Sequence, residues 1–162
     1  MQSYRIVVGF DGSEGGIRAL DWAVAQAARH GGTVHAVTAW HWTQPDAGVD
    51  IRAEQETIAR QSLDEAVTAA LAPYPRVAVS TETVPGSAAG ALTRASADAD
   101  LLVLGSHGHS RLFHAVLGSV AEACIRQATC PVVVVPVPHV GWDEETGTVG
   151  TKTTAPISTA VH

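Results

Sequence analysis

The chain has 162 residues, of which 46% are hydrophobic and 16% charged, enough for one domain with a buried core. Its formal net charge of −6 argues against the basic face that nucleic-acid-binding proteins usually carry. Lys152 is the only lysine, which excludes a P-loop of the form GxxxxGK[ST]. Any phosphate site must therefore be built from backbone amides, hydroxyls and arginine.

The N-terminus and the cysteines indicate the compartment. The first residues lead directly into a short apolar run over residues 6–8, with no long apolar stretch or small-residue cleavage pattern, so we expect a cytoplasmic protein. Cys124 and Cys130 are too few for a disulfide scaffold, and we expect both to be reduced core residues.

The first half of the chain alternates between strand patterns and helix patterns. We expect a strand over residues 4–9, then a helix over 14–30 whose apolar face carries Ile17, Leu20, Val24 and Ala27. A strand over 33–40 follows. A loop over 42–50, with proline and glycine, then leads into a long helix over 52–71.

The second half continues the alternation. A strand over residues 77–84 has valine and threonine on one face, a pattern that places it near an edge of the sheet. Pro85 and Gly86 form a turn, Ser87 caps a helix that runs to residue 97, and residues 101–104 form a continuous apolar strand. A helix over about 119–127 and a strand over 132–137 complete the order.

This order predicts an α/β fold in which an open, doubly wound parallel sheet carries helices on both faces. We expect one domain over residues 1–138. Residues 139–162 are rich in threonine, glycine and acidic residues and lack periodicity, so we expect them to form a disordered tail.

Two loops follow strands where doubly wound sheets bind ligands, beyond the carboxyl ends of the strands at the point where the strand order reverses. They are residues 9–13 and residues 105–108. Asp11 stands where a dinucleotide-binding turn would need GxGxxG, and its carboxylate repels phosphate but accepts hydrogen bonds from a ribose hydroxyl or an amino group. The alternative is that Asp11 or Ser13 only caps the following helix.

Glycines and a helix start indicate where an anion would bind. Gly105 and Gly108 allow backbone conformations that are closed to other residues, so that successive N–H groups converge on an anion. Gly118 and Ser119 open the helix that begins at 119, whose free amides and dipole attract anions, and Arg111 adds positive charge. These two sets of donors would hold a triphosphate.

Other interpretations of this segment stay open. The glycines would serve only turns, and Ser119 fits a capping box with the glutamate three residues later, which needs no ligand. His107, His109 and His114 suggest a metal site, but a carboxylate or thiolate at ligand spacing is lacking, so we expect exposed or phosphate-facing imidazoles. Ser106 and His107 are adjacent in sequence, which does not define a catalytic triad.

Taken together, these residues resemble the universal stress protein family. The pattern G-x2-G-x9-G-S over residues 105–119, preceded by the apolar strand and followed by CPVVVVP over 130–136, resembles the nucleotide-binding motif of that family. The opening IVVGFDGS, residues 6–13, resembles its first strand and turn. The resemblance covers about residues 4–137.

The resemblance implies a five-stranded parallel sheet of order 3-2-1-4-5, an adenine-nucleotide site across the first and fourth strands, and a homodimer formed through the last strand. The ligand it implies is ATP, with AMP as the alternative and Mg²⁺ as a companion of the phosphates. Neither nucleic acid nor a membrane is an expected partner.

By position, Asp11 would contact the adenosine part and Ala39 would offer backbone groups to adenine. The motif glycines would pass close to the ribose and phosphates, and Ser119 and Val120 would donate to the phosphates. Relatives often carry Arg or Lys where this chain has His107 and His109, which would weaken triphosphate binding or make it pH-sensitive. The expected nucleotide-binding residues are Gly9, Phe10, Asp11, Ala39, Gly105, Gly108, His109, Arg111, Gly118, Ser119 and Val120.

Three hypotheses for function follow. The first is an ATP-binding stress or signalling protein with little or no hydrolysis, because two donor sets occur without a recognisable catalytic base. The second is a nucleotide-free dimeric adaptor. The third is an ATPase or phosphotransferase, with a histidine in its mechanism.

Overall fold

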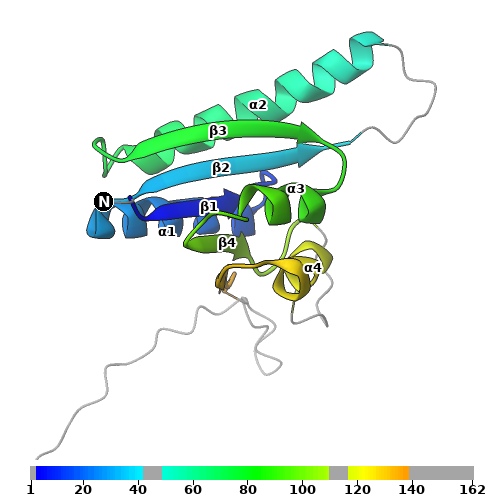
Figure 1. The fold of residues 1–162 in the computed structure, drawn as a ribbon. Helices are drawn as coiled ribbons and strands as arrows, with labels where there is room; N and C mark the ends of the chain where they lie inside the picture. The colour runs from blue at the N-terminus through cyan, green and yellow to red at the C-terminus, as the bar shows by residue number, and fades with distance from the viewer. Residues whose placement is uncertain (1–2, 42–48, 110–116, 139–162) are drawn as a thin grey trace, which may run out of the picture.

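Five strands and four helices alternate in the computed structural model, which describes residues 3–41, 49–109 and 117–138. The strands form one parallel sheet of order β3-β2-β1-β4-β5, which confirms the expected topology (Figure 1). The elements are β1 (Arg5–Gly9), α1 (Glu14–His30), β2 (Thr33–Trp40), α2 (Val49–Leu71), β3 (Ala78–Pro85), α3 (Ala88–Ala95), β4 (Leu101–Gly105), α4 (Ser119–Gln127) and β5 (Val132–Val135).

Helices cover both faces of the sheet. On one face, α1 and α2 pack against a core that includes Ile6, Val8 and Leu63. On the other face, α3 and α4 cover a second core that includes Val7 and Leu102 (Figure 1). Because β1 and β4 are buried on both sides, nearly all their residues must be apolar, which explains their unbroken apolar runs.

Several element ends differ from the expected ones. Helix α2 begins at Val49, so the end of the predicted 42–50 loop is helical, and residues 42–48 lie outside the described part of the chain. Strand β5 ends at Val135 and not at residue 137, because Pro136 has no N–H and the N–H of Val137 donates to the Ser106 hydroxyl at 3.2 Å. Strand β3 begins at Ala78, since the N–H of Val77 closes a turn onto the Tyr74 carbonyl at 3.1 Å.

Smaller shifts affect three other elements, whereas α1, β2 and α4 have the expected bounds. Strand β1 starts at Arg5, and β4 extends by one residue to Gly105. Helix α3 stops at Ala95, since Ser96 already has non-helical backbone angles and bonds its hydroxyl to the Thr93 carbonyl at 3.2 Å. The expected cap of α3 is confirmed: the Ser87 hydroxyl accepts from the N–H of Gly90 at 3.4 Å.

One more expectation about position is confirmed. Strand β3 lies at an edge of the sheet. Both cysteines are free thiols; Cys124 is fully buried, Cys130 only partly, and burial raises the pKa of the Cys124 thiol. No helix in the described ranges is long and apolar enough to cross a membrane. The predicted tail over 139–162 lies outside these ranges.

The first turn of α1 departs from the expected apolar stripe. Ile17 is 45% exposed, whereas Gly15 and Gly16 are buried. A Cβ atom built on Gly15 would overlap the backbone oxygen of His107, and one on Gly105 would lie 2.5 Å from the backbone of Gly15. Glycine thus lets the start of α1 pass directly against the exit of β4.

We therefore expect Gly15→Ala to destabilise the fold, although alanine has the higher helix propensity. The main chain at residue 107 would have to shift, at a cost of about 1–3 kcal/mol in the free energy of unfolding. The matched control is Gly90→Ala in α3, where the nearest atoms to a Cβ are 3.9 Å away; alanine should add about 0.5–1 kcal/mol there. Urea denaturation measures the free energy of unfolding of both variants. Equal stabilisation by the two substitutions would contradict the close packing of α1 against the exit of β4.

Candidate functional site

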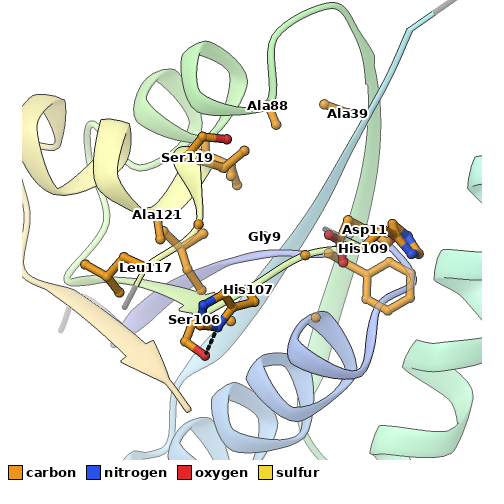
Figure 2. A pocket seen from close by; sticks show the side chains of 18 of the residues that line it. Gly9, Asp11, Ala39, Ala88, Ser106, His107, His109, Leu117, Ser119 and Ala121 are labelled. Atoms are coloured by element: carbon orange, nitrogen blue, oxygen red, sulfur yellow. Dashed lines mark hydrogen bonds between the residues drawn. The ribbon is translucent and has the colours of Figure 1, made fainter. Parts of the chain in front are cut away.

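A cavity of about 340 Å³ opens at the carboxyl ends of β1 and β4, where the strand order reverses. The turn after β1 forms one side, the loop after β4 and the start of α4 form another, and α3 closes the top (Figure 2). Its lining comprises Gly9, Phe10, Asp11, Gly16, Val37, Ala39, Ala88, Leu92, Leu104, Gly105, Ser106, His107, Gly108, His109, Leu117, Gly118, Ser119, Val120 and Ala121.

Ten of the eleven residues expected from the sequence line this one cavity. They come from β1 and its turn, the end of β2, the loop after β4, and the N-terminus of α4. The eleventh, Arg111, lies outside the described residues. Asp11 and Ser119, which are separated by more than half the chain, face the same space (Figure 2).

The turn after β1 holds Asp11 by its own hydrogen bonds. The Oδ1 atom of Asp11 accepts from the N–H of Ser13 at 2.9 Å and also from the Ser13 hydroxyl. That hydroxyl in turn accepts from the N–H of Gly16 at 3.1 Å and is the N-cap of α1. The expected capping role therefore belongs to Ser13, and Asp11 supports it with one oxygen.

The glycines of the second loop allow neighbouring atoms to approach the main chain closely. A Cβ on Gly108 would lie 2.5 Å from Oδ2 of Asp11, and the backbone of Gly105 packs on Gly15. Among the described glycines only Gly12, Gly31 and Gly86 have positive φ angles, so Gly105 and Gly108 do not adopt the left-handed conformation that glycine would allow them. Their requirement is steric: each leaves room for an atom of the turn or helix that follows β1.

Ser106 joins the loop after β4 to the start of α4. Its carbonyl accepts from the N–H of Gly118 at 2.7 Å, and its own N–H donates to Val135 in β5 at 2.9 Å. Its hydroxyl accepts from the N–H of Val137. This buried residue therefore sets the spacing between the loop after β4 and the start of α4, a role that its sequence position did not reveal.

The N-terminus of α4 does not form the capping box that was the alternative interpretation of Ser119. Gly118 is the N-cap, because its backbone is extended and its carbonyl accepts the first helical bond, from Glu122 at 3.0 Å. Ser119 is already helical, and the Glu122 carboxylate pairs with Arg126 one turn further on, at 2.8 Å. In the described structure no side chain caps this helix end, so its first amides have no side-chain acceptor.

The histidines contact the loop itself. His109 places Nε2 2.6 Å from the backbone oxygen of Asp11, so it links the loop after β4 to the turn after β1 (Figure 2). His107 places Nδ1 3.1 Å from the Ser106 hydroxyl. His114 lies outside the described residues, which contain no cluster of three His, Cys, Asp or Glu side chains able to hold a metal ion.

The apolar wall of the cavity was not expected. Leu92 of α3 is 4% exposed and lies over Gly9, where a Cβ would come within 2.9 Å of its Cδ1. Ala88, one turn earlier, lies near Ala39 at the end of β2 (Figure 2). The i, i+4 spacing of these residues gave only a general signal for a buried helix face, because apolar residues that line a cavity and apolar core residues share the same pattern.

The cavity thus combines an apolar slot, one carboxylate and a row of backbone donors. The slot offers surface to a flat apolar ring, whereas Asp11 accepts hydrogen bonds from hydroxyl or amino groups. The uncapped start of α4 attracts an anion. A molecule with an aromatic ring, hydroxyl groups and a negatively charged end matches all three.

Comparisons with known proteins agree with this architecture. A model of the Universal stress protein family matches residues 3–136. Universal stress protein Rv2005c of Mycobacterium tuberculosis is 37% identical over 131 residues, which cover 80% of this chain and 44% of that protein. The chain spans about half the length of the curated relatives it matches.

Solved structures share the fold. Universal stress protein UspA from Lactobacillus plantarum matches with a TM-score of 0.72 and 20% identity, over 83% of this chain and 99% of that one. A universal stress protein in complex with cAMP matches with a TM-score of 0.60 and 28% identity, over 81% of this chain and 95% of that one. From its sequence match over most of its length, the chain belongs to the universal stress protein family.

Proposed function

We propose that the chain binds an adenine nucleotide in the cavity between β1 and β4 and serves as a nucleotide-dependent stress or signalling protein. ATP is the expected ligand and AMP the alternative. The observation that carries the proposal is the uncapped start of α4, which faces the same cavity as the Asp11 turn. A structural relative with 28% identity was solved in complex with cAMP, and this adds support because cAMP is an adenine nucleotide.

The phosphate end of the nucleotide would lie at the start of α4. Gly118 has an ordinary φ of −73°, and the atom nearest to a Cβ there is the Ser106 oxygen at 3.4 Å, so a Cβ fits in van der Waals contact without backbone strain. A glycine that the backbone does not require is consistent with space used by a ligand. The amides of Ser119 and Val120 would donate to the phosphates.

The adenosine end would lie toward Asp11 and Ala39. The carboxylate of Asp11 suits ribose hydroxyls and disfavours phosphate, which orients the nucleotide along the cavity. Adenine would enter the slot between Ala39 and the α3 residues Ala88 and Leu92.

A divalent cation would arrive with the phosphates. Asp11 is the only carboxylate among the described lining residues, and Ser13 already occupies one of its oxygens. Mg²⁺ binds oxygen ligands and commonly keeps several waters while it bridges phosphates. The residues therefore fit Mg²⁺ as a companion of ATP and offer it no dedicated set of ligands.

Little or no hydrolysis is expected. Asp11 lies at the opposite end of the cavity from Ser119, where the phosphates would bind (Figure 2). His109 uses Nε2 to contact the Asp11 backbone, and His107 directs Nδ1 to Ser106. These contacts hold one ring nitrogen of each histidine against the protein, which favours a positioning role over activation of a water molecule next to a phosphate.

The first test is calorimetry of ATP with Mg²⁺, together with mass spectrometry of small molecules released from the purified, denatured protein. We expect saturable binding of ATP and an adenine nucleotide among the released molecules. An absence of both signals would favour the nucleotide-free adaptor, and turnover that persists through purification would favour the ATPase.

Gly118→Asp separates binding from stability. Aspartate is a good N-cap and complements the helix dipole, so the free energy of unfolding should rise by about 0.3 kcal/mol or more. The added carboxylate would repel the phosphates, and we expect the Kd for ATP to increase by at least about tenfold. Gly118→Asn, a neutral control of the same size and capping ability, should weaken binding less. Unchanged ATP affinity in the Asp variant would show that the phosphates bind elsewhere.

We also propose a homodimer through β5. This strand is at an edge of the sheet and Val132, Val133 and Val134 remain partly exposed, a surface that proteins usually cover. Light scattering at micromolar concentration should give twice the mass of the chain. A monomeric mass would contradict this assembly.

A further inference from the structure

The two carboxylate oxygens of Asp11 have different surroundings. Oδ1 accepts two hydrogen bonds from Ser13, one from its N–H and one from its hydroxyl. Oδ2 is the atom nearest to a Cβ built on Gly108, 2.5 Å away. Because the protein holds Oδ1, the carboxylate cannot rotate freely, and Oδ2 is directed toward the second loop of the cavity.

Ser13 makes this arrangement with a side chain that also caps α1. It is 7% exposed, and its hydroxyl links Oδ1 of Asp11 to the N–H of Gly16. A hydroxyl has one hydrogen to donate and can also accept, so it performs both roles at once. The carboxylate is thereby tied to the first turn of a packed helix.

The main chain of Asp11 is held from the other side. His109 contacts the Asp11 backbone oxygen through Nε2 at 2.6 Å, and Gly16 leaves space for Oδ1, since a Cβ there would lie 2.8 Å from it. Both the backbone and the carboxylate of Asp11 are therefore positioned by neighbouring elements before any ligand binds.

We propose that Ser13 is a positioning residue that makes the site discriminate ribose hydroxyls, through the fixed Oδ2 of Asp11. The inference rests on the proposed nucleotide function. A carboxylate oxygen accepts from a ribose hydroxyl in a charge-assisted hydrogen bond, whose strength depends on geometry. A carboxylate free to rotate makes that bond less often and loses entropy when it forms.

The measurement is the ratio of two dissociation constants, that for 2′,3′-dideoxy-ATP divided by that for ATP, obtained by calorimetry with Mg²⁺. The two ligands share the base and phosphates and differ only in the ribose hydroxyls. In the unaltered protein we expect a ratio of about ten or more, which corresponds to one charge-assisted hydrogen bond.

Ser13→Ala should lower this ratio to about three or less, because the hydroxyl contact with Oδ1 is lost. Ser13→Gly should do the same with little loss of stability, since glycine is an acceptable N-cap. Ser13→Thr keeps the hydroxyl and should retain the ratio. Ser87→Ala is the control: it removes the hydroxyl that caps α3, away from Asp11, and should leave the ratio unchanged.

Two results would overturn the inference while the proposed function stands. One is an unaltered protein that binds ATP and its dideoxy analogue equally well. The other is a pair of folded Ser13→Ala and Ser13→Gly variants that keep the full ratio. If the unaltered protein binds neither ligand, the proposed function fails and this inference fails with it.

Discussion

The central constraint is that β1 and β4 are parallel neighbours whose chains leave toward opposite faces of the sheet. After β1 the chain turns to α1, and after β4 it leads to α4 on the other face. Two loops that leave the carboxyl ends of neighbouring strands in opposite directions cannot fill the space between them. The cavity is therefore a consequence of strand order, and the residues on those loops determine what it binds.

Backbone hydrogen bonds and the small size of glycine convert this gap into a defined site. Ser106 ties the loop after β4 to α4 and to the end of β5, whereas Gly15 and Gly105 bring α1 against that same loop. With no lysine or arginine among the described lining residues, an anionic end would be met mainly by neutral N–H groups. Such groups orient an anion through geometry, so their spacing matters more than net charge.

The sequence predicted the order and type of all nine elements, because burial on both faces leaves apolar runs that differ clearly from helical periodicity. It missed ends decided by tertiary contacts, such as the end of β5, where Val137 bonds Ser106. It identified most of the loop residues that line the cavity, whereas the alternative interpretation of Ser119 as the helix cap is wrong, because Gly118 provides that cap. The sequence did not predict that Ala88 and Leu92 line the cavity. Apolar residues that line a cavity have the same helical spacing as core residues, and only the fold distinguishes them.

We propose that the loop after β4 and the start of α4 bind one ligand together. This proposal is tested most directly by amide chemical shifts in ¹H–¹⁵N spectra recorded during titration with ATP and Mg²⁺. We expect the amides of Gly108, Ser119 and Val120 to shift together and to saturate at the same concentration, while the amide of Gly31, beyond the amino end of β2, stays unchanged. Shifts confined to the amino ends of the strands, or no shift at these three amides, would contradict this proposal.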